Sequence, residues 1–407
     1  MRKNWIELPF SKAVNINPKV SLNKGKTYPF IDMKSITPGK KEIEKYEVKE
    51  FKGCGSKFEV DDVLFARITP CLENGKIARY RPQKGLDSIA FGSTEFIIFR
   101  ERKGITHKEF IFYLVTNKSF TNFSINQMSG TSGRQRVPNG CFDNYILSLP
   151  PLKQQEAIAH ILASLDNKIE LNRQMNQTLE EMAKAIFKSW FVDFDPVYAK
   201  AQRHKPAGIS DEIAALFPDS FVQSELGLIP KGWHVANLGK IINFKKGKKP
   251  DSSKIACSLA HHLLIAAFDG KSYEKVSTQN MVLSEIDDVL MVMDGASSGR
   301  VETGYEGVVG STIAKLEVHS KLRPFIYFFL KDHEKEINSK TTGTSIPHAD
   351  KNLILDFVST VPPDDLLTIF NQQQRFIREK INLNKEESFS LRALSSTLLP
   401  KLLSGEI

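Results

Sequence analysis

The sequence predicts an α+β protein in which one folded unit occurs twice. Two globular domains of mixed α/β structure would be separated by a pair of long antiparallel helices that pair as in a coiled coil, giving a pseudo-twofold tandem repeat. Three observations predict this fold: a long-period internal repeat, a heptad-like apolar pattern after each copy, and short alternating segments within each copy. The length of 407 residues also exceeds that of one ordinary compact domain.

The internal repeat consists of five short motifs that recur in the same order. The pairs are Trp5-Ile-Glu-Leu8 with Trp233 to Leu238, Asp61-Asp-Val-Leu64 with Asp287-Asp-Val-Leu290, Gly92-Ser-Thr94 with Gly310-Ser-Thr312, Gly130-Thr-Ser132 with Gly343-Thr-Ser345, and Leu149-Pro-Pro151 with Val361-Pro-Pro363. The offset between copies falls from 228 to 212, as expected for homologous domains that differ in loop length. Each pair alone is weak, but their common order indicates a duplication.

A long helix is predicted after each copy, because the offset stays at 212 beyond the double proline. Residues of one face then recur at alternating steps of four and three, which is the coiled-coil spacing. A helix over 152–192 would be roughly 60 Å long and needs a partner for its apolar stripe, and the other copy is the obvious one. The residues predicted to pair the helices are Ile158, Leu162, Leu165, Ile169, Asn172, Leu179, Ile186, Ile377, Ile381, Asn384, Leu391 and Leu398.

An antiparallel pair would place the two domains at opposite ends of a rod. Asn172 and Asn384 each lie midway along their helix and would meet near the pseudo-twofold axis. A paired polar contact there could fix the register at some cost in stability, although two unrelated surface asparagines are the alternative. The predicted organisation is a first domain at 1–151, a helix at 152–200, a connector at 201–228, a second domain at 229–363 and a helix at 364–407.

Short segments within each domain alternate between apolar and polar residues. They predict strands at 63–67, 89–99, 289–293 and 308–318, and helices at 108–116 and 323–329. The connector is rich in proline and glycine, with one short helix expected near 211–216.

Charge is distributed unevenly, since residues 1–150 hold 25 Lys and Arg against 15 Asp and Glu. A basic domain beside neutral segments suits a polyanionic partner, although a solvated basic surface is equally common. The four cysteines include no C-x-x-C pair, and the amino terminus lacks the apolar core of a signal peptide. A cytoplasmic location is expected.

In the first domain, the loop Gly130-Thr-Ser-Gly-Arg-Gln-Arg136 combines flexible backbone with hydroxyl, amide and guanidinium groups. Such a loop can approach phosphates, while an arginine contacts guanine or a glutamine contacts adenine. The predicted DNA-contacting residues here are Ser132, Arg134, Gln135 and Arg136. The alternative is a glycine turn in which Arg136 pairs locally.

In the second domain, the predicted contacts are Lys245, Lys246, Lys248, Lys249, Ser298, Arg300, Thr344 and Ser345. Lysines of this density can hold phosphates, which position a protein without specifying sequence, although a solvated cluster is equally common. His348 and the pair His261-His262 are more simply surface histidines.

Four further motifs resemble those of specificity subunits of type I restriction–modification systems. They are Gly130-Thr-Ser-Gly-Arg-Gln-Arg-Val137, Leu149-Pro-Pro-Leu-Lys-Gln-Gln-Glu156, Leu165-Asp-Asn-Lys-Ile-Glu-Leu-Asn172 and Phe187-Lys-Ser-Trp-Phe-Val-Asp-Phe-Asp195. The carboxyl-terminal Leu398-Leu-Pro-Lys-Leu-Leu-Ser-Gly405 resembles the end of the family's second helix. The resemblance covers essentially the whole chain, and the central helix carries its most specific motif.

This resemblance implies that each domain is a target recognition domain for one half of a bipartite, asymmetric double-stranded DNA target. The helices would act as a ruler across an unread spacer and dock two methyltransferase subunits, with motor-nuclease restriction subunits completing the enzyme. S-adenosylmethionine, ATP and Mg²⁺ would act in those partners, and this chain would bind no cofactor or metal and catalyse nothing.

Motifs for catalysis fail on inspection. Phe51-Lys-Gly-Cys-Gly55 matches a methyltransferase cofactor loop but lacks the preceding strand and following helix. Gly270-Lys-Ser272 would end a phosphate loop, but Ile265 stands where glycine is required. Two alternatives remain: a scaffold that does not bind DNA, and, less favoured, a self-contained DNA methyltransferase.

Overall fold

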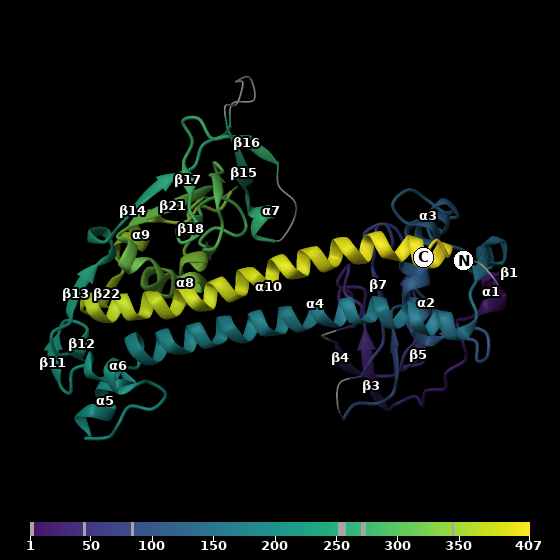
Figure 1. The fold of residues 1–407 in the computed structure, drawn as a ribbon, viewed down its shortest axis with the longest axis horizontal. Coiled ribbons are helices and arrows are strands. Elements are labelled where there is room, and N and C mark those ends of the chain that lie inside the picture. Colours follow the sequence, from purple (N-terminus) through teal and green to yellow (C-terminus); the bar gives the residue numbers. More distant parts are fainter. Residues whose placement is uncertain (1–3, 44–45, 83–84, 251–257, 270–273, 344–345) are drawn as a thin grey trace. The chain divides into compact units, whose positions relative to one another are not determined.

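The computed structural model (Figure 1) describes the chain except for residues 1–3, 44–45, 83–84, 251–257, 270–273 and 344–345. It contains two compact units. Unit 1 comprises residues 1–172 and 386–407, and unit 2 comprises residues 173–385. The helices α4 (Leu152–Phe187) and α10 (Asp364–Ser404) each contribute to both units.

Unit 1 is built on β-structure with short helices on one side. Its strands are β1 (Ile6–Pro9), β2 (Val14–Ile16), β3 (Thr27–Ile31), β4 (Glu47–Glu50), β5 (Ser56–Glu59), β6 (Val63–Ala66), β7 (Ile77–Arg79), β8 (Ile89–Gly92), β9 (Phe96–Glu101) and β10 (Ile146–Leu149). Its shorter helices are α1 (Phe10–Ala13), α2 (Lys108–Thr116), α3 (Lys118–Asn126) and the 3-10 helix Asn139–Asn144. Among its described residues, two four-stranded sheets have the orders β2-β9-β6-β7 and β4-β3-β8-β5, and β1 pairs with β10.

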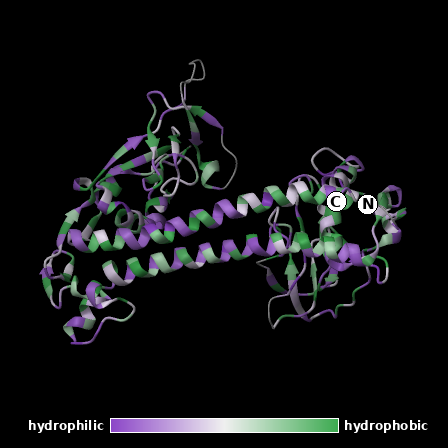
Figure 2. Ribbon diagram, in the orientation of Figure 1, coloured by the Kyte–Doolittle hydropathy of each residue, from purple (hydrophilic) through white to green (hydrophobic). Residues whose placement is uncertain are grey.

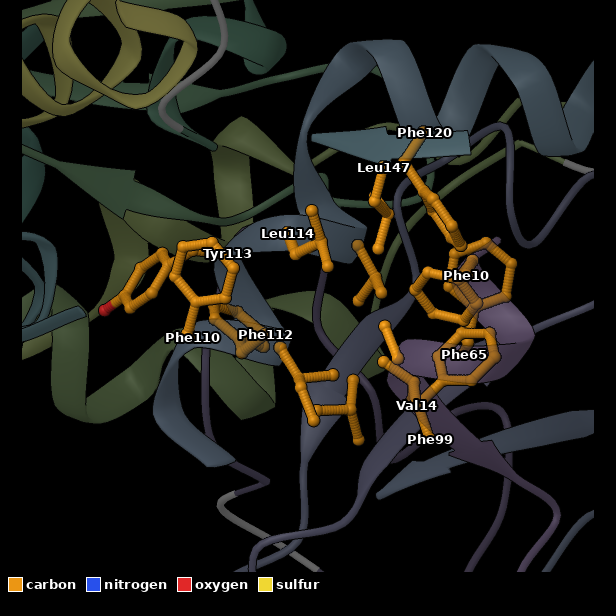
Figure 3. Packing of buried hydrophobic residues seen from close by; sticks show 14 of the residues in the cluster. Phe10, Val14, Phe65, Phe99, Phe110, Phe112, Tyr113, Leu114, Phe120 and Leu147 are labelled. Atoms are coloured by element: carbon orange, nitrogen blue, oxygen red, sulfur yellow. The ribbon is translucent and has the colours of Figure 1, made fainter. Parts of the chain in front are cut away.

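Aromatic rings fill the main core of unit 1 (Figure 3). Phe10, Phe65, Phe99, Phe120 and Phe142 are fully buried and contact one another, with centroids of Phe120 and Phe142 5.5 Å apart. Leu162 of α4 and Leu402 of α10 belong to the same core. The amino-terminal part of α4 and the carboxyl-terminal part of α10 are therefore structural components of this unit.

Unit 2 repeats the architecture of unit 1. Its strands are β11 (Phe221–Ser224), β12 (Gly227–Pro230), β13 (His234–Asn237), β14 (Ile242–Lys246), β15 (Leu259–Leu263), β16 (Lys275–Ser277), β17 (Leu283–Ser284), β18 (Val289–Val292), β19 (Val301–Glu302), β20 (Gly307–Val309), β21 (Ile313–Val318) and β22 (Val358–Val361). Its shorter helices are α5 (Asp195–Ala201), α6 (Asp211–Ala215), α7 (Ile265–Phe268), α8 (Arg323–Ser339) and α9 (Lys351–Asp356), with 3-10 turns at Leu238–Lys240 and Ser320–Leu322.

The strand order of unit 2 matches that of unit 1. Its described four-stranded sheets are β14-β21-β18-β19 and β16-β15-β20-β17, and β13 pairs with β22. Each strand corresponds in chain order to one strand of unit 1, including the parallel pairs β3 with β8 and β15 with β20. The hairpin β11–β12 is additional. The tandem α+β repeat predicted from the sequence is confirmed.

Close backbone contact explains the repeated Gly-Ser-Thr motif. A Cβ on Gly92 would lie 2.2 Å from the carbonyl oxygen of Ile31, and one on Gly310 would lie 2.7 Å from that of Leu263. These contacts occur where the parallel strands meet, so only glycine allows this strand spacing.

The repeated Asp-Asp-Val-Leu motif is also structural. Its second aspartate is 1% exposed in both copies and accepts a backbone hydrogen bond from three residues earlier, Glu59 N to Asp62 and Glu285 N to Asp288, both at 2.8 Å. Buried carboxylates need cationic partners. Arg100 supplies one for Asp62, and Lys315 with Arg323 supplies them for Asp288.

The long helices begin directly after their double prolines, because proline fits the first turn of a helix but not its interior. The α-helical part of α4 ends at Phe187 and continues as the π-helical turn Lys188–Val192. Phe194 then adopts a left-handed conformation, with φ of 54°. At about 1.5 Å per residue, the 36 residues of α4 span about 54 Å.

Helices α4 and α10 pack antiparallel, and apolar and polar residues alternate along both (Figure 2). Within unit 1, Asn172 donates hydrogen bonds to Glu387 at 2.8 Å and to Ser388 at 3.3 Å. Within unit 2, Asn384 donates to the Asn176 oxygen at 2.8 Å. The predicted contact between Asn172 and Asn384 would join the two units and stays a prediction.

Every residue predicted to pair the helices is buried or half-buried. Ile158, Leu162, Asn172, Ile381 and Asn384 are buried, and the other seven, listed next, are half-buried: Leu165, Ile169, Leu179, Ile186, Ile377, Leu391 and Leu398. Burial fits the predicted role for these residues.

Candidate nucleic-acid interface

The loop Gly130–Arg136 of unit 1 is closed by a four-bond backbone clip. Arg136 exchanges backbone hydrogen bonds with Ser129, at 2.9 and 3.1 Å. On the other side, Thr69 N donates to Gln135 O at 3.0 Å, and Val137 N donates to Arg67 O at 2.8 Å. The loop is therefore held against the end of β6, and its side chains project from a fixed base.

The predicted contact residues of this loop lie at the surface. Ser132, Arg134 and Arg136 are exposed, and Gln135 is half-buried. Arg136 forms a forked ion pair with Glu95, with Nε to Oε2 at 2.9 Å and Nη2 to Oε1 at 2.7 Å. The local pairing weighed as an alternative for Arg136 is thus present, and it raises the pKa of the guanidinium.

Unit 2 contains the same clip with different side chains. His348 exchanges backbone hydrogen bonds with Thr342, at 2.7 and 2.9 Å. Gly295 N donates to Pro347 O at 2.9 Å, and Ala349 N donates to Met293 O at 2.8 Å. Of the predicted contacts in this loop, Thr344 and Ser345 lie outside the described residues.

Gly343 is needed for the shape of the second loop. Its φ is +93°, and an added Cβ would lie 2.5 Å from the carbonyl oxygen of Ile346. The repeated Gly-Thr-Ser motif therefore begins with a residue that only glycine can supply without strain.

The lysine cluster of unit 2 lies at the end of β14, and Lys245, Lys246, Lys248 and Lys249 are all exposed. Lys245 pairs with Glu317 at 3.0 Å, and Lys246 pairs with Asp294 at 2.8 Å. Asp294 also contacts His348 Nδ1 at 2.7 Å. Burial would raise the pKa of Asp294, but its hydrogen bonds with Lys246 and His348 outweigh burial and lower it.

Two predicted contacts are not retained. Ser298 is fully buried, so its hydroxyl cannot reach a ligand without local opening. Arg300 is half-buried, pairs with Asp269 and Glu302 at 2.7 Å each, and lies over the Phe268 ring. Both serve the packing of unit 2.

The sequence analysis missed Glu95, Asp294 and the importance of His348. Glu95 follows a repeated motif, but nothing in the sequence couples it to Arg136, 41 residues later. His348 could have been singled out by adding the offset of 212 to Arg136.

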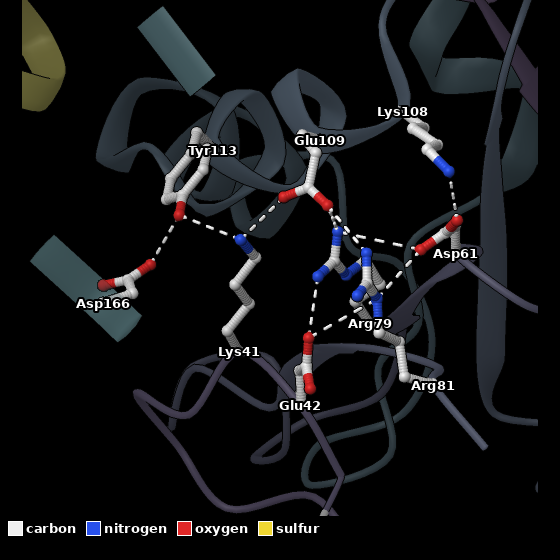
Figure 4. Close-up of polar contacts among 9 residues, drawn as sticks. All are labelled: Lys41, Glu42, Asp61, Arg79, Arg81, Lys108, Glu109, Tyr113 and Asp166. Atoms are coloured by element: carbon white, nitrogen blue, oxygen red, sulfur yellow. Dashed lines mark hydrogen bonds and ion pairs between the residues drawn. The ribbon is translucent and has the colours of Figure 1, made fainter. Parts of the chain in front are cut away.

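A buried charge network connects the first domain to its long helix (Figure 4). Arg79, 2% exposed, pairs with Glu109, with Glu42 at 2.7 Å, and more distantly with Asp61 at 3.8 Å. Lys41 donates to Glu109 at 2.8 Å and to the Tyr113 hydroxyl at 3.1 Å. At the edge of the network, Arg81 and Lys108 pair with Asp61 at 3.1 and 2.6 Å.

Tyr113 completes the connection by donating to Asp166 of α4 at 2.7 Å. Burial would raise the pKa of Glu109, but hydrogen bonds from Lys41 and Arg79 outweigh it and lower the pKa to about 2. Burial raises the pKa of Asp166. The network therefore holds Glu109 ionised and fixes the domain to α4.

The second unit makes the equivalent connection with the charges exchanged. Arg378 occupies the position 212 residues after Asp166 and donates to Asp287 at 2.8 Å. Asp287 is the repeat counterpart of Asp61. Each domain is thus tied by an ionic contact to its following helix, and these groups are structural rather than catalytic.

Among the described residues, no group of three or more histidine, cysteine, aspartate or glutamate side chains is arranged to hold a metal ion. Within the same part of the chain, no helix is long and apolar enough to cross a bilayer.

Comparisons with known proteins agree on one family. The model of the type I restriction modification DNA specificity domain matches residues 11–181. The type I restriction enzyme HindI specificity subunit of Haemophilus influenzae is 25% identical over 97% of this chain and 97% of its own length. The MjaIX specificity subunit of Methanocaldococcus jannaschii is 24% identical over 74% of this chain and 69% of its own.

A solved structure shares the fold. The S subunit of a type I restriction–modification system from M. genitalium matches with a TM-score of 0.55 and 17% identity, covering 98% of this chain and 96% of that chain. Two domains of one topology, each followed by one of two long antiparallel helices, define the class of DNA specificity subunits, which are not themselves catalytic. The chain belongs to the family of type I restriction–modification specificity (HsdS) subunits.

Proposed function

We propose that this chain reads a bipartite, asymmetric DNA sequence and directs methylation and restriction by partner subunits. The observation that carries the proposal is the pair of domains with one strand order and one backbone clip but different clip side chains. Two different recognition surfaces on one scaffold suit two different half-sites. We take residues 1–151 and 229–363 as the target recognition domains, 152–200 and 364–407 as the helices, and 201–228 as the connector.

The proposed DNA contacts are surface groups on the loop and the lysine cluster. They are Ser132, Arg134, Gln135 and Arg136 in the first domain, and Lys245, Lys246, Lys248 and Lys249 in the second, with Thr344 and Ser345 still predictions. The lysines would position phosphates, and the arginines and glutamine can reach base edges. A double-stranded DNA target places the work of the chain in the cytoplasm.

The partners are two methyltransferase subunits and motor-nuclease restriction subunits, which would carry S-adenosylmethionine, ATP and Mg²⁺. Large apolar side chains on the exposed faces of the long helices support a docking role. On α10 these are Phe376, Leu383, Phe389 and Leu394, and on α4 they are Ile161, Leu171 and Met182, with exposures from 43% to 73%. Soluble proteins rarely leave such residues uncovered along one helix.

The decisive experiment combines DNA binding with a methylation assay. The purified chain should bind duplex DNA with an affinity that falls steeply with salt, because phosphate contacts release counterions. Methylation should occur only after a separate methyltransferase subunit is added. Methylation by the chain alone would contradict the proposal, and complete absence of DNA binding with or without that subunit would favour a pure scaffold.

The helices should set the spacer between half-sites. Deleting 170–176 from α4 together with 382–388 from α10 removes seven residues from each helix and keeps the alternating steps of four and three. The deleted segments lie against each other, as the contacts of Asn172 and Asn176 indicate. Each helix shortens by about 10 Å, so the preferred spacer should shorten by about three base pairs.

Methylation-site mapping of the complex with its methyltransferase checks this expectation. The half-site bases should stay the same, since neither recognition domain is altered. Removing only one of the two segments is the control, because it puts the helices out of register and should weaken binding without defining a new spacer. An unchanged spacer or changed half-site bases would refute the ruler.

A further inference from the structure

Arg136 and His348 occupy the same structural position in the two domains. Each bridges to two segments: Arg136 to Ser129 and Ile68, and His348 to Thr342 and Asp294. The flanking backbone bonds match one for one, and the two residues are separated by the repeat offset of 212. The fold therefore presents one side chain at a defined point of each domain.

A carboxylate occupies the donor groups at this position in both domains. In the first, Glu95 takes the Nε and Nη2 of Arg136, and Nη1 donates to Arg134 O at 3.2 Å. In the second, Asp294 contacts both His348 and Lys246. All of these side chains reach solvent, from 19% exposed for Asp294 to 49% for His348.

The geometry at Arg136 is that of nucleic-acid recognition. A guanidinium that binds a carboxylate through two parallel N–H groups uses the same fork that binds a phosphate or the O6 and N7 edge of guanine. Glu95 thus stands where a DNA acceptor would stand, and its negative charge opposes an approaching phosphate.

We propose that Arg136 and His348 are corresponding DNA-contacting residues of the two domains, and that Glu95 and Asp294 are internal acceptors that DNA must displace. This inference rests on the proposed function and deepens it. Duplex of any sequence must first break the ion pair, so the carboxylates lower affinity for non-target DNA. A base edge or phosphate that satisfies the released fork restores the lost contacts at the target.

The test uses the full chain and a random-sequence duplex, with affinity measured by fluorescence anisotropy over a range of salt concentrations. Glu95→Gln should tighten binding to this duplex by about three- to tenfold near 0.1 M salt. It should also steepen the salt dependence by about one unit, as expected for one additional phosphate contact. Asp294→Asn should act in the same direction through His348 and Lys246.

A double variant separates exchange from simple loss of negative charge. In Glu95→Gln with Arg136→Ala, the gain should disappear, because the released guanidinium is absent. Likewise, His348→Ala should reduce the gain from Asp294→Asn. Glu379→Gln is the matched control, since Glu379 forms an exposed pair with Arg375 at 2.8 Å on α10, and it should change affinity less than twofold.

The outcomes distinguish this inference from the proposed function. If Glu95→Gln behaves like Glu379→Gln, or if its gain persists without Arg136, the inference is wrong while DNA recognition stands. If the unaltered chain and every variant fail to bind duplex at low salt, both are wrong. Circular dichroism of each variant verifies the fold, and the exposure of the altered side chains predicts no change.

Discussion

Replacing Glu109 with alanine is expected to destabilise unit 1 by about 3–5 kcal/mol, because it leaves buried cations without their partner. Arg79 is 2% exposed and Lys41 is 10% exposed, and both pair with this carboxylate. The connection from the domain to α4 through Tyr113 should loosen at the same time. Hydrogen exchange should therefore accelerate in β7, in α2 and in the amino-terminal part of α4.

Urea unfolding followed by hydrogen exchange and mass spectrometry measures this loss separately for each unit. The matched control is Glu47→Ala, since Glu47 is 70% exposed and its pair with Lys49 lies in solvent. That change should cost less than about 1 kcal/mol. Equal effects of the two substitutions would show that the buried network contributes no more than a surface pair.

The same network predicts the acid behaviour of unit 1. The pKa of Glu109 lies at about 2 in the folded protein, below its ordinary value of 4.5. Its ionised form therefore stabilises the fold fully above pH 4.5, and this contribution is lost as the pH falls from about 4.5 toward 2. Over this range the unaltered chain should lose stability more steeply than Glu109→Ala.

Replacing Phe187 with alanine is expected to cost unit 2 about 3–5 kcal/mol through loss of buried surface and formation of a cavity. Phe187 is 1% exposed, and its ring contacts Phe325 and Phe328 of α8 and Phe370 of α10 at centroid distances of 5.5 to 6.3 Å. It is the point where the carboxyl-terminal part of α4 enters the core.

Tryptophan fluorescence reports this change, because Trp190 and Trp233 both lie in the core of unit 2. Phe376→Ala on α10 is the control. Phe376 is 72% exposed, so its removal should leave stability within about 0.5 kcal/mol while weakening the proposed docking of a methyltransferase subunit. A stability loss at Phe376 equal to that at Phe187 would contradict the core assignment.

Most of the fold could be predicted because a duplication presents the same evidence twice. The expected strands contain β6, β8, β9, β18, β20 and β21, and the helix expected at 108–116 coincides with α2. Helix α8 extends ten residues beyond the expected 323–329, because Leu330 and Ile337 continue its buried face with fewer apolar residues. Periodicity detects an element more reliably than its end.

The candidate site was less predictable, because its geometry depends on residues distant in the sequence. Exposure of the lysine cluster follows from its charge, but burial of Ser298 depends on how α8 packs over its loop. The network of unit 1 joins Lys41, Arg79, Glu109 and Asp166, which no local pattern connects. Such contacts appear only when the sheet and the long helix are placed together.

The core of unit 1 has a consequence for biosynthesis, because it includes Leu402 near the end of the chain. The ribosome adds 240 residues between Leu162 and Leu402, which takes roughly 10 to 50 seconds at ordinary elongation rates. During this interval the earliest-made domain exposes an unfilled apolar site to chaperones and proteases. Translation that stops short of the last turns of α10 would therefore yield a first domain with an incomplete core, marked for degradation before it could engage a chromosome.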